Sequence, residues 1–159
     1  HRRLLDLSVS YPGGSIASDA MPWINADGSI YEGMEWPLPE ELSAHPRSSG
    51  TFTRFLREYV RERETMTLMD ALAKCTILPA RVIESCAPQI TRKVRMQEGC
   101  DADIVVFDME TLTDRADFIA MNRPSEGVKH LIVGGVMVIA DGQLDTEAAP
   151  GRPIRRSPA

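Results

Sequence analysis

Few side chains in this sequence have types and spacing suited to chemistry. Its three histidines stand far apart, at His1, His45 and His130. They form neither an HxH nor an HExxH pair, so the sequence predicts no complete zinc site within this chain. Its three cysteines are equally scattered, at Cys75, Cys86 and Cys100, with no CxxC pair. We interpret them as buried free thiols in a reducing cytosol.

Two segments of the sequence contain aspartates that could belong to a catalytic or metal site. The run Ser15–Asp19 reads as a short buried strand that ends in Asp19. An aspartate at the end of a strand is usually the cap of a turn or a helix, so Asp19 taken alone defines no site. The run Gly99–Asp103 alternates oxygen-bearing side chains as calcium loops do. It has only two carboxylates and no distant glutamate, which favours a turn before a strand.

The elements that would position these residues change character along the chain. Residues 20–47 hold four prolines and match neither the helical nor the strand period. A long irregular loop of this kind is usually functional or disordered, and its aromatic residues argue against disorder. Helical periodicity then begins over residues 52–62, and Thr67–Asp70 has the form of a capping box before a second helix. Pro79 suits the first turn of a third, short helix.

After Pro88 the pattern becomes that of strands. Ile104–Phe107 is predicted to be one strand, and residues 130–139 to be a hairpin around Gly134-Gly135, which suits a primed turn. Asp141-Gly142 offers a second tight turn, and the tail from residue 148 should cover a surface or fray. We therefore predict two parts, a helical part over residues 1–88 and a β part over residues 89–159.

The composition limits the classes of partner. The chain has 159 residues and a formal net charge of −5, and an acidic protein attracts neither nucleic acid nor an anionic membrane surface. No apolar run is long enough to span a bilayer, and the start, His1–Asp6, lacks the apolar core of a signal peptide. That start also lacks an initiator methionine, so we expect a piece of a longer protein. From the free cysteines we expect a cytoplasmic location.

Taken together, the order of these segments resembles the amidohydrolase superfamily, and most closely its N-acyl-D-amino-acid deacylases, or D-aminoacylases. The passages that carry the resemblance are Ile16–Pro22, His45-Pro46-Arg47 with Gly50–Leu56, Leu68–Val82 and Gly99–Asp108. The last of these is shared across the superfamily, whereas the HPR and GTF passages are typical of the deacylases. Thr53 stands where those enzymes often have proline. Residues 25–44 look like an insertion relative to deacylases with a short loop.

The resemblance implies an α/β fold, namely the end of a metal-dependent hydrolase (β/α)₈ barrel followed by part of a small β-sandwich. Residues 15–19 would be the last barrel strand, and Asp19 would be both a catalytic residue and a metal ligand at its carboxy end. The cofactor would be zinc, which lowers the pKa of bound water, while Asp19 takes the proton. The remaining ligands would come from earlier strands of the barrel, outside this chain.

Arg47 gains a role from the same resemblance. An N-acyl amino acid has an α-carboxylate, which a guanidinium group binds with two parallel hydrogen bonds. We therefore expect Arg47 to be substrate-binding, and we expect the loop over residues 20–45 to shape the pocket with one of its aromatic residues, Trp23, Tyr31 or Trp36. The expected reaction is hydrolysis of a non-peptide C–N bond, from an N-acyl-D-amino acid to a carboxylate and a D-amino acid.

Three alternatives remain open from the sequence. One is a cyclic-amide hydrolase of the dihydroorotase or hydantoinase kind, against which the HPR and GTF passages count. Another is a non-catalytic scaffold relative, against which the retention of Asp19 counts. The third is a free-standing small domain, which would leave large apolar faces in water. The expected partners are a small N-acyl amino acid and the rest of the catalytic barrel, and a homo-oligomer is left open.

Overall fold

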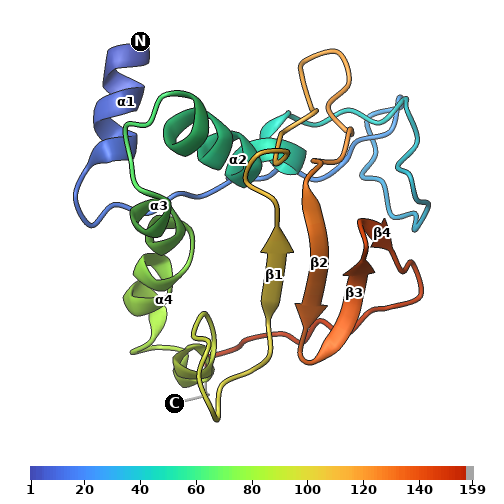
Figure 1. Cartoon of the computed structure of the whole chain (residues 1–159). Coiled ribbons are helices and arrows are strands. Elements are labelled where there is room, and N and C mark those ends of the chain that lie inside the picture. Colours follow the sequence, from blue (N-terminus) through green and yellow to red (C-terminus); the bar gives the residue numbers. More distant parts are fainter. Residues whose placement is uncertain (157–159) are drawn as a thin grey trace.

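The computed structural model describes residues 1–156, with helices gathered on one side and a sheet on the other (Figure 1). The helical elements are α1 (Arg2–Ser10), α2 (Arg47–Phe55), the π-helix η1 (Leu56–Glu62), α3 (Leu68–Cys75), α4 (Ile77–Ile83) and the 3₁₀ helix η2 (Pro88–Arg92). The strands are β1 (Ile104–Phe107), β2 (Val128–Val133), β3 (Val136–Ala140) and β4 (Gln143–Leu144). No helix in the described part is long and apolar enough to cross a membrane.

The predicted helices form, with local differences at their ends. α3 begins as the capping box requires, because the Thr67 hydroxyl accepts a hydrogen bond from the backbone N–H of Asp70 at 3.1 Å. α4 begins at Ile77, two residues before Pro79. α2 continues into η1 without a break, so residues 47–62 form one continuous helical segment. This segment lies above the upper ends of β1 and β2 in Figure 1, between the other helices and the sheet.

Helix α1 was not predicted. None of its residues is buried, and Leu4, Leu5 and Leu7 are all more than half exposed. Val9 packs against the apolar core, and the other contacts of the helix are polar. The carboxylate of Asp6 accepts two hydrogen bonds from Arg63, at 2.7 and 2.9 Å, and a third from the Tyr59 hydroxyl at 2.7 Å. Because these contacts join residues more than fifty positions apart, apolar periodicity could not have revealed them.

The sheet has four antiparallel strands in the order β1-β2-β3-β4. The predicted hairpin is confirmed: Val133 pairs with Val136, and Gly134 and Gly135 have φ angles of 56° and 84°, as a type I′ turn needs. The second predicted turn repeats this geometry, with φ angles of 50° and 78° at Asp141 and Gly142. The sheet is therefore a simple meander in which each strand pairs with the next.

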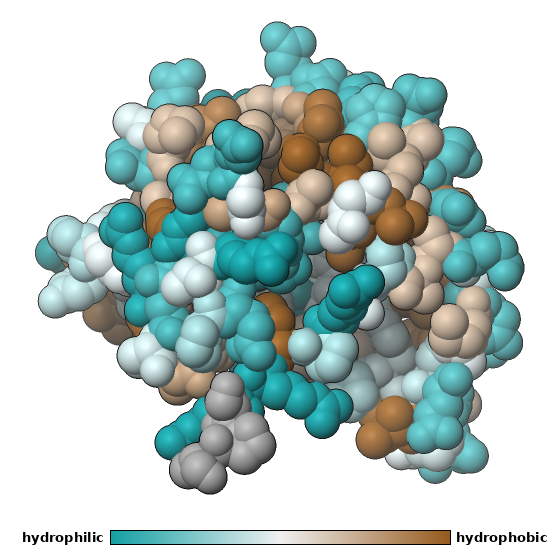
Figure 2. Space-filling view, turned by 90° about the horizontal axis from the view of Figure 1, so that it is seen from below, coloured by the Kyte–Doolittle hydropathy of each residue, from teal (hydrophilic) through white to brown (hydrophobic). Residues whose placement is uncertain are grey.

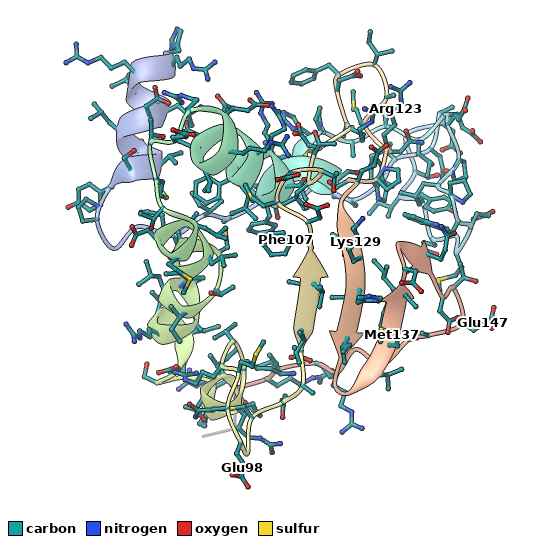
Figure 3. All side chains as sticks on the ribbon, in the orientation of Figure 1. Glu98, Phe107, Arg123, Lys129, Met137 and Glu147 are labelled. Carbon is teal, nitrogen blue, oxygen red and sulfur yellow. The ribbon has the colours of Figure 1, made fainter. Side chains whose placement is uncertain are left out.

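One apolar core connects the helices to the first part of the sheet. Phe55, Tyr59 and Ala71 are buried in it together with Leu112, which follows β1 and is only 2% exposed. Phe107 at the end of β1 points from the strand toward the helices (Figure 3) and packs against the same cluster. The helical and β parts thus share a core at this end of the sheet.

Polar contacts reinforce that junction. A single nitrogen of Arg61, Nη1, donates hydrogen bonds to the backbone carbonyls of three residues after β1, at 2.8 to 2.9 Å; these are Met109, Glu110 and Leu112. Four residues earlier, Arg57 donates from Nε to the Asp114 carboxylate at 2.7 Å. The end of the helical segment is therefore fixed to the segment that leaves β1.

Much apolar surface remains uncovered. The accessible surface is 11057 Å², whereas a compact monomer of 17.6 kDa would expose about 7,900 Å². Val105 and Val106 in β1 are 49% and 45% exposed, and the space-filling view shows apolar side chains in several groups on the face seen from below (Figure 2). The described residues thus leave faces that are suited to packing against further protein.

The predicted buried strand over residues 15–19 does not form within the described residues. This segment is extended but has no strand pairing, and the Asp19 side chain is 88% exposed. The physical reason is that no other strand lies beside it in the described residues. Its backbone bonds to a helix instead, since the Ile16 N–H donates to the carbonyl of Lys74 at 3.0 Å.

Candidate active site

Asp19 and Arg47, which lie 28 residues apart in the sequence, are in direct contact. Arg47 donates from Nε to the backbone carbonyl of Asp19 at 2.6 Å, and its Nη2 lies 3.1 Å from Asp19 Oδ2. The Asp19 side chain is 88% exposed and that of Arg47 is 34% exposed. The structure therefore brings both predicted site residues together and leaves the carboxylate open to a ligand.

The start of α2 holds Arg47 in this position. Arg47 is the first residue of the helix, and its backbone N–H donates to Nδ1 of His45 at 3.1 Å. The next side chain, Ser48, exchanges two hydrogen bonds of 3.1 Å with the backbone of Met21. The chain immediately after Asp19 is thus attached to the first turn of α2, which fixes the separation of Asp19 and Arg47.

A cavity of about 660 Å³ is lined by Arg47 and by residues 15–17, just before Asp19. Its walls are both polar and apolar, and include Arg47, His45, Ile16, Tyr59 and Phe118. The Phe118 ring meets the His45 ring edge to face at a centroid distance of 5.1 Å and is 71% exposed. A cavity with a guanidinium group and an aromatic wall can hold a small molecule that has one anionic and one apolar end.

Sequence reasoning did not single out Phe118. It lies in an irregular segment after β1, where no periodicity assigns it to a face. The loop reaches α2 because the Ser49 hydroxyl donates to the carbonyl of Met121 at 3.0 Å, and the Ser125 hydroxyl donates to the carbonyl of Ser49 at 2.9 Å. Contacts across more than seventy residues of sequence carry no local signal.

The loop over residues 20–45 does not shape the cavity in the way that the sequence predicts. It is ordered by isolated bridges from Ile24 to Ile30 and to Ser43. Trp23 and Trp36 line a second cavity, of about 830 Å³, beside the sheet rather than the cavity beside Arg47. None of the three loop aromatics expected to shape the pocket, Trp23, Tyr31 and Trp36, lines the cavity at Arg47. That surface comes from Phe118 instead.

The described residues provide one candidate metal ligand near this cavity. No three side chains of histidine, cysteine, aspartate or glutamate gather closely enough to hold a metal ion within residues 1–156. Asp19 fits as a single ligand because its carboxylate is exposed and offers hard oxygen atoms. Cys75 does not fit, since burial raises the pKa of its thiol to about 11 and keeps it protonated.

The acidic run before β1 is engaged in ion pairs. Lys93 Nζ lies 2.6 Å from the Asp103 carboxylate and 3.1 Å from that of Asp101. The hydrogen bond from Lys93, followed by one from the backbone N–H of Gly134, holds the pKa of Asp103 below its usual range. These carboxylates stabilise the entry to β1 and are not available to calcium.

Comparison with known proteins decides between the family assignments. The amidohydrolase family model matches residues 36–139, which include Arg47, the helical elements from α2 to η2 and most of the sheet. The chain belongs to the amidohydrolase family. This amidohydrolase chain is 43% identical over 119 residues to an N-acyl-D-glutamate deacylase of Alcaligenes xylosoxydans xylosoxydans, a match that covers 75% of the chain and 23% of the relative.

Solved structures of amidohydrolases agree with this assignment. A D-aminoacylase with a binuclear metal centre superimposes with a TM-score of 0.63 and 33% identity, over 71% of this chain and 23% of that one. An N-acyl-D-glutamate deacylase from Bordetella bronchiseptica, complexed with zinc and a phosphonate inhibitor that mimics the tetrahedral intermediate, gives 0.55 and 41% identity, over 64% of this chain and 21% of that one. The chain spans about a quarter of the length of the relatives it matches.

Proposed function

We propose that this chain is the carboxy-terminal part of a metal-dependent amidohydrolase that hydrolyses N-acyl-D-amino acids to a carboxylate and a D-amino acid. The relatives named above are deacylases of this kind, and one of them holds zinc. The observation that carries the proposal is the contact of Asp19 with Arg47, which lines a cavity of substrate size. It places a proton acceptor and a carboxylate-binding group within one substrate length of each other.

Arg47 binds the substrate in this proposal. Its Nε is held by the backbone carbonyl of Asp19, while Nη2 faces a carboxylate oxygen. The α-carboxylate of an N-acyl amino acid can take the place of the Asp19 carboxylate on Nη2, because both are planar anions. That exchange releases the Asp19 side chain for catalysis at the moment the substrate enters.

Asp19 acts as general base and then as general acid in this proposal. When bound, zinc polarises the scissile carbonyl and lowers the pKa of water toward neutrality. Asp19 Oδ2 then accepts the proton of the attacking water and returns it to the departing amine nitrogen. Asp19 would also be one metal ligand, and the other ligands would come from protein outside this chain.

The proposed architecture follows from the same assignment. Residues 1–88 would be the end of a (β/α)₈ barrel, with residues 15–19 as its last strand, and residues 89–159 would be part of a β-sandwich. The unpaired segment at residues 15–19 supports this, as do the exposed leucines of α1 and the open face of β1. In the complete protein, the rest of the barrel would pair with that segment and cover those faces.

Two other functions are less well supported. A cyclic-amide hydrolase is less well supported because the relatives that the chain matches are named deacylases of N-acyl amino acids or D-aminoacylases. A non-catalytic scaffold has no need for an exposed carboxylate held against an arginine, since an exposed ion pair contributes little to stability. The deacylase uses both groups.

The substitution Asp19→Asn in the complete, zinc-loaded enzyme tests the proposal. The amide is nearly the same size and can still meet Arg47, but it cannot accept a proton. We expect kcat on an N-acyl-D-amino acid to fall by roughly 10² to 10⁴-fold while KM changes little. Glu147→Gln, in an exposed turn after β4, is the matched control and should leave kcat unchanged. Full kcat in Asp19→Asn at normal zinc content would refute the role of Asp19.

A further inference from the structure

Lys74 is the one buried charged side chain in the described residues, with 6% of its surface exposed. Its ammonium donates hydrogen bonds to the backbone carbonyls of Tyr11 and Gly14, at 2.6 and 3.1 Å. Burying an ammonium group is expensive unless its donors are satisfied. An apolar side chain could fill the same volume at lower cost, so the stability of α3 does not explain the lysine.

The backbone of Lys74 contacts the same segment. Lys74 lies in the last turn of α3, where carbonyl groups lack partners within the helix. Its carbonyl accepts the N–H of Ile16 at 3.0 Å. One residue of α3 therefore holds the segment from Tyr11 to Ile16 at three points, two through its side chain and one through its backbone.

That segment leads directly to Asp19. Only Ala17 and Ser18 separate Ile16 from Asp19. On its far side, Asp19 is held by Arg47 and by the contact of Met21 with the first turn of α2. The backbone of Asp19 has a φ angle of 47°, which is uncommon for a residue with a side chain and persists only where its surroundings hold it.

We propose that Lys74 is a positioning residue that fixes the direction of the Asp19 carboxylate by anchoring the Tyr11–Ile16 segment to α3. This inference rests on the proposed catalytic role of Asp19. Lys74 touches no substrate and acts through the backbone. A displacement of about 1 Å at a catalytic group is enough to lower the rate on the order of a hundredfold.

The test is Lys74→Met in the complete, zinc-loaded enzyme, because methionine keeps the length and removes the donors. We expect kcat per bound zinc to fall on the order of ten- to a hundredfold, with KM for an N-acyl-D-amino acid unchanged because Arg47 is untouched. Lys129→Met removes an exposed lysine and should change neither value. Equal kcat in Lys74→Met and the wild type would overturn the proposal.

A double-mutant cycle separates positioning from a general structural effect. If Lys74 acts through Asp19, then Lys74→Met should lower kcat no further once Asp19→Asn is present. An unchanged fold-effect in that background would show that Lys74 acts elsewhere and would overturn the inference. Wild-type kcat in Asp19→Asn alone would instead refute the proposed function, so the two failures are distinct.

Amide hydrogen exchange gives a readout that does not depend on activity. Lys74→Met should speed the exchange of peptides that cover residues 11–19 and leave those of β2 unchanged. Unchanged exchange over residues 11–19 would overturn the anchoring step.

If Lys74→Met does not fold, Gly14→Ala perturbs the same contact from the other side. An added Cβ would lie 3.2 Å from the Tyr11 carbonyl oxygen and 3.8 Å from Lys74 Nζ. We expect a smaller fall in kcat with the same constant KM, and full kcat would again overturn the proposal.

Discussion

Arg47→Lys isolates the geometry of carboxylate binding from its charge. The guanidinium uses two nitrogens at once, Nε to the Asp19 carbonyl at 2.6 Å and Nη2 to the carboxylate at 3.1 Å. A single ammonium cannot keep both directions, so the lysine loses one charge-assisted hydrogen bond, worth about 1.5–3 kcal/mol. Each 1.4 kcal/mol is tenfold in affinity, so KM should rise about ten- to a hundredfold.

The assay is steady-state hydrolysis of an N-acyl-D-amino acid by the complete, zinc-loaded enzyme. Because Arg47 is expected to hold the substrate equally in the ground and transition states, KM should rise more than kcat falls. Removing the α-carboxylate, as in the corresponding N-acyl amine, should abolish the difference between variant and wild type. Arg81→Lys, on the exposed face of α4, is the control. Unchanged KM in Arg47→Lys would return Arg47 to a surface role.

Three further predictions concern stability and reactivity. Leu112→Ala should lower the free energy of unfolding by about 2–5 kcal/mol, because Leu112 is 2% exposed in the shared core. Urea denaturation measures the loss. A loss no larger than that caused by the same substitution of an exposed leucine would contradict the burial of Leu112. Hydrogen bonds from Arg63, then Tyr59, hold the pKa of Asp6 well below its usual range. Asp6 therefore stabilises the fold above the unfolded pKa of about 4 and stops doing so as pH falls through its folded value. The wild type should lose more stability than Asp6→Asn in acid denaturation, and parallel curves would contradict this. Burial raises the pKa of the Cys75 thiol to about 11. Cys75 should therefore react with iodoacetamide at pH 8 more slowly than the exposed Cys86. Equal rates of modification, measured by mass spectrometry, would refute the burial of Cys75.

The elements that the sequence predicted are those whose stabilising contacts are local. The capping box at Thr67 and the Gly134-Gly135 turn need only neighbouring residues, and both form as expected. The strand over residues 15–19 needs a second strand beside it, which no pattern within the segment can supply. Helix α1 is held by Arg63 and Tyr59 rather than by an apolar stripe, so its periodicity gave no signal.

The residues of the candidate site also fall into those that the sequence identified and those that only the structure reveals. Asp19 and Arg47 were identified through a family resemblance, and the structure adds that their side chains meet. Phe118 and Lys74 were not identified from the sequence. The first lies in an irregular loop, and the second occupies a helical position where a lysine is ordinarily a solvated surface residue. Only burial and distance, which the folded chain defines, distinguish them.

The continuous helical segment from Arg47 to Glu62 has a consequence for how the enzyme could diverge. It is roughly 20 Å long, with Arg47 at one end and the three carbonyl contacts of Arg61 at the other. Close-packed elements transmit small displacements rather than absorb them. Substitutions after β1 can therefore tilt this segment and shift Arg47, and with it the proposed contact to a substrate carboxylate. Under the proposed function, selection could adjust substrate affinity at positions remote from the pocket while Asp19 and Arg47 stay fixed.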